Sequence, residues 1–135
     1  MRADLRTTSE AAILLLLVRV GFTVGSFAAV ERCFERWFPQ TTPSSSDPPP
    51  FVVAERVGAA VRAASRRLHG TTCLAETLAA AAMLRRRGLT STRKIGVRAP
   101  ADGVPLDAHA WLESHGALVV GDHADLGEYR ILTTR

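Results

Sequence analysis

The sequence is poor in the residues that build disulfide or metal scaffolds, because it has only two cysteines and four histidines. Cys33 and Cys73 lie in different predicted elements, and neither belongs to a CxxC pair or to a Cys/His spacing typical of zinc sites. We therefore expect neither a disulfide framework nor a metal site, and no cofactor. So few cysteines are also typical of a reducing compartment, which predicts a cytoplasmic protein.

Lysine is almost absent, since Lys94 is the only lysine among 17 basic residues. The chain is also crowded with alanine, so its arginine content reflects coding bias as much as a phosphate-binding surface, and no nucleic-acid partner is expected. The net charge of +4 is unevenly distributed. Residues 1–50 are balanced, residues 51–98 have ten basic and two acidic side chains, and residues 99–135 have two basic and six acidic ones.

Length excludes a multidomain enzyme with its own dinucleotide fold, since 135 residues correspond to about one domain. With 47% hydrophobic and 22% charged residues, the composition is that of a globular protein. A Pro/Ser-rich segment, residues 39–50, cannot continue a helix and is predicted to be an extended or mobile linker. It separates an N-terminal helical arm, residues 1–38, from a core, residues 51–135.

The longest apolar run, residues 11–30, is long enough to span a membrane and includes a GxxxG spacing. However, Arg19, Thr23 and Ser26 form a polar stripe at helical spacing. The helix is also expected to continue without a break through charged residues to Arg36. These features favour a buried or partner-docking helix, so membrane association is not expected.

Hydrophobic periodicity predicts two helices and then three strands in the core. The second helix is predicted to be capped by Thr71 or Thr72 and stopped by Gly88. A turn at His115 and Gly116 separates the last two strands. The predicted elements are helices over 52–68 and 73–87, a strand over 92–98, a Pro/Gly loop over 99–106, and strands over 107–113 and 117–122.

Cys73 is expected at the start of its helix, where unpaired backbone N–H groups and the helix dipole stabilise a thiolate and can face an oxyanion. By itself, this position is more typical of a small buried side chain than of a nucleophile. The hairpin adds further groups. A two-residue turn at His115 and Gly116 pairs residues whose numbers sum to 231 and places His109 opposite Asp122, whereas a three-residue turn would put that carboxylate on the other face.

A thiol, an imidazole and a carboxylate in this arrangement are what nucleophilic acyl transfer requires. The imidazole accepts the thiol proton, the carboxylate fixes the imidazole tautomer, and backbone amides stabilise the tetrahedral intermediate. The alternative is a paired histidine and aspartate on a hairpin surface, which we would favour if Cys73 were absent. On the same face, Trp111 is expected to pack against Val120 rather than to line a substrate groove.

Four sequence blocks occur in the order seen in one known family, and they extend over about residues 52–135. The sequence resembles the lasso-peptide leader peptidases, the B proteins of lasso-peptide clusters, which have a transglutaminase-like, papain-related core. The blocks are Thr72-Cys73-Leu74, the helix end LRRRGL at 84–89, Ile95-Gly96-Val97, and AHAWLE at 108–113 followed by Asp122.

The resemblance implies an α+β, papain/transglutaminase-like core with the catalytic cysteine at a helix N-terminus packed on a small antiparallel sheet. It implies Cys73 as the nucleophile, His109 as general base and acid, and Asp122 as the orienting carboxylate, with Asp125 as the alternative third member. Members of that family hydrolyse the bond between leader and core in a lasso-peptide precursor.

The resemblance also implies partners. Because the chain is too short to include a leader-recognition domain, it resembles the split form, which works with a separate leader-recognition protein and with the ATP-dependent lasso cyclase. Two other functions remain open at this point. The same triad with an amine acceptor would make the protein a transglutaminase or acyltransferase, and accidental spacing of the triad would leave a non-enzymatic adaptor, with membrane binding through residues 11–30.

Overall fold

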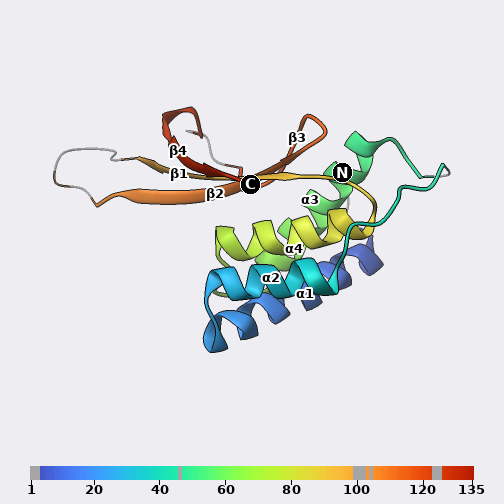
Figure 1. The fold of residues 1–135 in the computed structure, drawn as a ribbon, viewed down its shortest axis with the longest axis horizontal. Coiled ribbons are helices and arrows are strands. Elements are labelled where there is room, and N and C mark those ends of the chain that lie inside the picture. Colours follow the sequence, from blue (N-terminus) through green and yellow to red (C-terminus); the bar gives the residue numbers. More distant parts are fainter. Residues whose placement is uncertain (1–3, 46, 99–102, 104, 123–125) are drawn as a thin grey trace.

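A computed structural model describes residues 4–45, 47–98, 103, 105–122 and 126–135. In these residues, four α-helices precede a four-stranded antiparallel sheet of order β3-β2-β1-β4. The helices lie on one side of the sheet, and the end where β1 leads to β2 projects beyond them (Figure 1). The predicted α+β class is confirmed. The elements are α1 (Leu5–Val24), α2 (Phe27–Trp37), α3 (Pro50–Arg67), α4 (Cys73–Arg86), β1 (Thr92–Arg98), β2 (Asp107–Ser114), β3 (Ala117–Val120), a short 3-10 helix η1 (Leu126–Glu128) and β4 (Arg130–Thr134).

The long N-terminal helix is broken, so the prediction of an uninterrupted helix to residue 36 is wrong. α1 ends at Val24, and the Ser26 side chain then caps α2 by accepting a 3.2 Å hydrogen bond from the Ala29 N–H. The break turns α2 back along α1, which buries Val30. A Cβ at Gly21 would lie only 2.9 Å from a Val30 methyl carbon. The first glycine of the GxxxG spacing therefore allows close packing of two helices of the same chain.

α1 is long and apolar enough to cross a membrane by length and composition alone, and 28% of its most apolar window is buried. One face, which includes Ala11 and Leu14, belongs to the hydrophobic core, whereas Ile13 and Val20 on another face are exposed. In this fold, α1 is therefore a core helix with an apolar outer surface.

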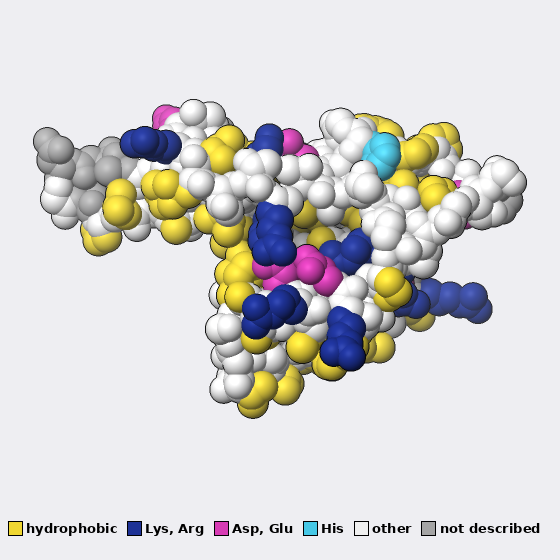
Figure 2. Space-filling model, viewed as in Figure 1, with side chains coloured by type: hydrophobic (Ala, Val, Ile, Leu, Met, Phe, Trp, Pro, Cys, Tyr) yellow, Lys and Arg dark blue, Asp and Glu magenta, His cyan; other side chains and the backbone are white. Residues whose placement is uncertain are grey.

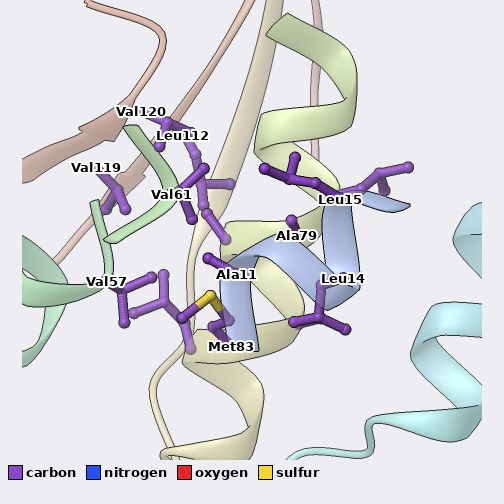
Figure 3. Packing of buried hydrophobic residues seen from close by; sticks show 14 of the residues in the cluster. Ala11, Leu14, Leu15, Val57, Val61, Ala79, Met83, Leu112, Val119 and Val120 are labelled. Carbon is purple, nitrogen blue, oxygen red and sulfur yellow. The ribbon is translucent and has the colours of Figure 1, made fainter. Parts of the chain in front are cut away.

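One hydrophobic core joins the segments on either side of residues 39–50. Figure 3 shows Ala11 of α1, Val57 of α3 and Met83 of α4 close together, with Val119 and Val120 of β3 nearby. The helical arm thus contributes to the same core as the helices that follow the Pro/Ser-rich segment. Burial of these side chains is the main source of stability for a domain of this size.

The Pro/Ser-rich segment lies against the C-terminal end of α4. Thr41 donates its N–H to the Arg85 carbonyl at 3.0 Å and its hydroxyl to the Arg86 carbonyl at 2.8 Å. These carbonyls are among those that a helix end leaves without partners, so the segment acts as a cap. Pro43 lies so close to Gly88 that a Cβ there would be 2.4 Å from the proline nitrogen.

A buried ion pair connects α2 to the sheet. Glu31 Oε1 lies 2.9 Å from Arg93 Nη1, and the two side chains are only 8% and 9% exposed. The more exposed Arg135 approaches the same carboxylate at 3.4 Å. Figure 2 shows acidic side chains surrounded by basic ones below the sheet. The Arg93 guanidinium also lies over the Phe27 ring, with Cζ 4.8 Å from its centroid.

The β2–β3 hairpin has the predicted two-residue turn but not the predicted register throughout. His115 and Gly116 both have positive φ, as this turn requires. Ser114 pairs with Ala117 and Glu113 pairs with Leu118, as predicted. Leu112 then pairs with Val120 and not with Val119, so the register shifts by one residue. The cause is a bulge, which lets the consecutive Val119 and Val120 both enter the core.

This bulge overturns the expected pairing of His109 with Asp122. β3 ends at Val120, and the shifted register would bring position 122 opposite Ala110 instead.

The side of β3 that faces the helices is held by α3, because the Val119 carbonyl accepts a 2.6 Å hydrogen bond from Arg62 of α3. Trp111 does not pack against Val120 as predicted, because Val120 belongs to the core beneath the sheet and Leu112 is its partner.

Candidate active site

Cys73 is the first residue of α4, as the sequence predicts. The Thr72 hydroxyl caps the helix by accepting a 3.2 Å hydrogen bond from the Ala75 N–H, and the Thr72 carbonyl accepts from the Glu76 N–H at 3.1 Å. This pattern leaves the N–H groups of Cys73 and Leu74 without an acceptor within α4. The cysteine is partly exposed and not in a disulfide. A partly exposed thiol thus lies beside two amides suited to an oxyanion.

His109 lies on β2, and its imidazole is held by a backbone carbonyl. Nε2 lies 2.7 Å from the oxygen of Gly121, directly before Asp122 in the chain. Because a carbonyl oxygen only accepts hydrogen bonds, this contact places a proton on Nε2. The exposed Asp122 is thus brought near His109 through its neighbour's carbonyl.

Two aromatic rings pack against the His109 ring. Trp111 is nearly parallel to it, with centroids 6.1 Å apart and an interplanar angle of 21°, and Tyr129 lies at 5.7 Å. The buried Tyr129 donates its hydroxyl to Asp107 at 2.5 Å, and Arg98 covers its ring with Cζ 4.8 Å from the centroid. The imidazole therefore lies in an aromatic cluster that is itself held by charged groups.

Two glycines make room for this cluster. A Cβ at Gly96 would lie 2.9 Å from Tyr129 Cβ and 3.2 Å from the Trp111 ring. A Cβ at Gly121, where φ is +88°, would lie 2.6 Å from both the Ala110 carbonyl oxygen and Trp111 Cβ. Both positions therefore require glycine on steric grounds, and Gly121 also does so for its backbone conformation.

Tyr129 and the strand that follows it were not predicted from the sequence. β4 is exposed along its whole length, so its sequence, RILTT, lacks the clear alternation of a half-buried strand. Its pairing with β1 is set by the fold, not by a local turn. The one usable signal is that Tyr129 is the only tyrosine in the chain.

The structure does not bring Cys73 and His109 together, because Cys73 begins α4 in the helical layer and His109 lies on the outer face of the sheet. In Figure 1, α4 begins on the side where the β1–β2 end of the sheet projects, and His109 is the third residue of β2. Leu112 of the same strand packs among the helices, so alternation directs His109 and Trp111 to the face away from the helices and from Cys73. Among the described residues, no hydrogen bond joins His109 to Cys73 or to the Asp122 side chain. Asp125, the alternative third member, lies outside the described residues.

The described part of the chain also holds no group of three or more His, Cys, Asp or Glu side chains that could bind a metal ion. The candidate groups are thus a thiol and backbone amides at the start of α4, and an imidazole, a backbone carbonyl and the aromatic cluster on the outer face of the sheet.

One carboxylate on the His109 face has a pKa that depends on its neighbours. A hydrogen bond from Lys94, at 2.9 Å, lowers the pKa of Glu113 below its usual value; desolvation opposes this in part, and a hydrogen bond from Trp111 adds a smaller lowering effect. A lowered pKa stabilises the fold above the carboxyl's unfolded pKa, and this contribution is lost as pH falls through the folded pKa. Lys94→Met should therefore raise the pKa of Glu113 and reduce the acid sensitivity of unfolding.

The expected change in stability is small, about 0.2–1 kcal/mol, because the Glu113 side chain is 42% exposed. NMR titration of the Glu113 carboxyl and urea unfolding from pH 3 to 7 would measure both effects. An unchanged Glu113 titration in Lys94→Met would contradict the assigned cause.

A model of the transglutaminase-like superfamily matches residues 14–134. The chain belongs to this superfamily, whose members are generally cysteine-type enzymes. The match begins within α1, in keeping with the contribution of that helix to the core. No curated protein and no solved structure matches the chain.

Proposed function

We propose that this chain is a cysteine peptidase that removes the leader peptide from a lasso-peptide precursor. The observation that carries the proposal is the position of Cys73, a partly exposed thiol at the capped start of α4 in a transglutaminase-like domain. His109, whose Nε2 is held by the Gly121 carbonyl, lies on β2 on the outer face of the sheet. The ordered sequence blocks around both residues support the lasso-peptide subtype.

The proposed reaction passes through an acyl-enzyme. The His109 imidazole accepts the thiol proton, and the thiolate attacks the carbonyl carbon of the bond between leader and core. The N–H groups of Cys73 and Leu74 face the oxyanion. The imidazolium then protonates the departing core amine, a thioester to the leader remains, and water hydrolyses it with His109 as base.

This mechanism requires His109 and Cys73 to come within hydrogen-bond distance when the precursor binds. Because alternation along β2 directs His109 away from α4, this step requires the β1–β2 end of the sheet to rearrange around the bound precursor. The aromatic cluster would keep the imidazole in place before that step. We assign Asp122 the role of stabilising the imidazolium from a neighbouring position, as a supplement to the Gly121 carbonyl.

The proposal includes partners. The precursor would be presented by a separate leader-recognition protein, and the released core amine would be joined to a carboxyl side chain by the separate lasso cyclase. The chain supplies the cleaving step in this scheme. We therefore expect slow cleavage when the recognition protein is left out.

Mass spectrometry of the precursor after incubation with this chain and the recognition protein tests the proposal. We expect cleavage at one bond, with products that together gain one water. Cys73→Ala should abolish cleavage, His109→Ala should reduce its rate at least ~10³-fold, and Asp122→Ala should have a smaller effect. Cys33→Ala, which changes the exposed thiol on α2, is the matched control and should cleave normally. Unchanged cleavage by Cys73→Ala would exclude the proposed nucleophile.

Amine transfer is the second candidate, because the superfamily match is named for transglutaminases. The same thioester would then be attacked by an amine instead of water. An added amine such as putrescine would appear in the product mass, and its incorporation in place of water would assign the chain to this second class.

A further inference from the structure

A cavity of about 250 Å³ opens between α1 and the start of α4. Its walls include Leu15, Leu16 and Phe22 from α1, Leu68 from the end of α3, and Thr72 and Ala75 from the start of α4. Hydrophobic side chains reach the surface at this end of the helical layer (Figure 2). The interior is therefore mainly apolar, although the cavity opens at the surface.

The polar groups at the rim are already engaged. Arg19 Nη1 donates to the His69 carbonyl at 2.8 Å, and the Thr71 hydroxyl donates to the Leu68 carbonyl at 2.9 Å. Gly70 has φ +80°, and a Cβ there would lie 3.3 Å from the Arg19 guanidinium. These contacts hold the loop between α3 and α4 against α1, so the cavity is preformed and its rim is not arranged for a charged ligand.

The cavity adjoins the proposed nucleophile. Thr72 directly precedes Cys73, Ala75 follows two residues later, and both contribute to the wall. A group attached to Cys73 therefore starts within the first turn of the helix that closes the cavity. The volume is below the ~300–1,000 Å³ typical of whole small-molecule sites, which suits a side chain instead of a complete peptide.

We propose that this cavity binds an apolar side chain of the peptide segment that acylates Cys73. The inference rests on the proposed function, since it assigns a specificity site to the same nucleophile. Transfer of an aliphatic or aromatic side chain from water into such a cavity should favour the reaction about tenfold to a hundredfold over a substrate with a small side chain.

Alkylation of the two cysteines tests the inference without any need for peptidase activity. The intact chain would be treated with N-methyl- and N-benzyl-2-chloroacetamide. In each reaction the thiolate sulfur attacks the methylene carbon and displaces chloride, while the thiol proton passes to solvent. Peptide mapping by mass spectrometry gives the rate at each cysteine. We expect the benzyl reagent to be favoured about tenfold or more at Cys73 and not at Cys33, the internal control.

Two arginine substitutions on α1 provide a matched pair. Leu16 is 45% exposed and lines the cavity, whereas Val20 is 60% exposed and does not. Leu16→Arg should reduce the benzyl preference at Cys73 to below about twofold, and Val20→Arg should leave it unchanged. Circular dichroism and thermal unfolding would verify that both variants are folded. Equal loss in the two variants, or no preference at Cys73 in the unsubstituted chain, would overturn the inference.

The two proposals can fail separately. Precursor cleavage that depends on Cys73, without any benzyl preference, would retain the peptidase and exclude the cavity as its side-chain site. A benzyl preference that Leu16→Arg abolishes, with the precursor left intact, would retain the binding cavity and exclude the leader-peptidase function.

Discussion

Gly121→Ala is expected to reduce precursor cleavage about 10²-fold or more. The new Cβ would lie 2.6 Å from the Ala110 carbonyl oxygen and from Trp111 Cβ, so the backbone must move. That movement takes the Gly121 carbonyl away from His109 Nε2, which it now approaches to 2.7 Å. Displacement of a catalytic group by about 1 Å is enough for a loss of this size. Initial rates by mass spectrometry, with NMR of the imidazole protons, would measure activity and tautomer together.

Gly116→Ala is the matched control for this prediction. Gly116 also has a positive φ, of 78°, but nothing lies within 4 Å of the Cβ that alanine would add. Both variants therefore incur the conformational cost of a left-handed alanine, about 1–2 kcal/mol, and only Gly121→Ala displaces a neighbour. We expect Gly116→Ala to retain activity within about twofold. Equal losses would attribute the effect to general destabilisation, and full activity of Gly121→Ala would exclude this carbonyl as the His109 partner.

Arg93→Met is expected to destabilise the protein by about 3–5 kcal/mol. The substitution leaves the Glu31 carboxylate, 8% exposed, without its 2.9 Å partner in the space between α2 and the sheet. Arg135 lies near the same carboxylate, but its side chain is 62% exposed and replaces little of the lost interaction. Urea unfolding followed by circular dichroism would give the change in the free energy of unfolding.

Two further variants separate the cost of an unpaired charge from the value of the pair. Arg135→Met removes only the exposed partner and should change stability by less than about 1 kcal/mol. Glu31→Leu combined with Arg93→Met removes both buried charges and should recover much of the loss, because well-packed apolar side chains often replace such pairs without penalty. If Arg93→Met alone unfolds with unchanged free energy, the carboxylate is not buried as described.

Local signals were sufficient for several elements of the site. Thr72 followed by an alanine-rich amphipathic segment predicted where α4 begins, and alternation predicted β1 over its full observed length. His115 and Gly116 predicted a two-residue turn, which is present. Each of these elements depends on residues within a few positions of one another, so a local sequence pattern is enough to predict it.

Other features depend on packing between distant segments. α1 and α2 separate at Gly25 because a single helix would carry Val30 away from the core. The bulge in β3 follows from the burial of both Val119 and Val120 beneath the sheet. Tyr129 reaches His109 only because β4 pairs with β1. None of these causes is visible in a local sequence pattern.

The sequence by itself therefore determined the α+β class, the helix that begins at Cys73 and the strand that carries His109. Tertiary structure alone decided which group holds the imidazole, because the bulge moves position 122 out of register and brings the Gly121 carbonyl to Nε2 instead. The physical reason is that helix starts and turns are set by neighbouring residues, whereas strand register near the site is set by the volume that β3 must bury against α3 and α4.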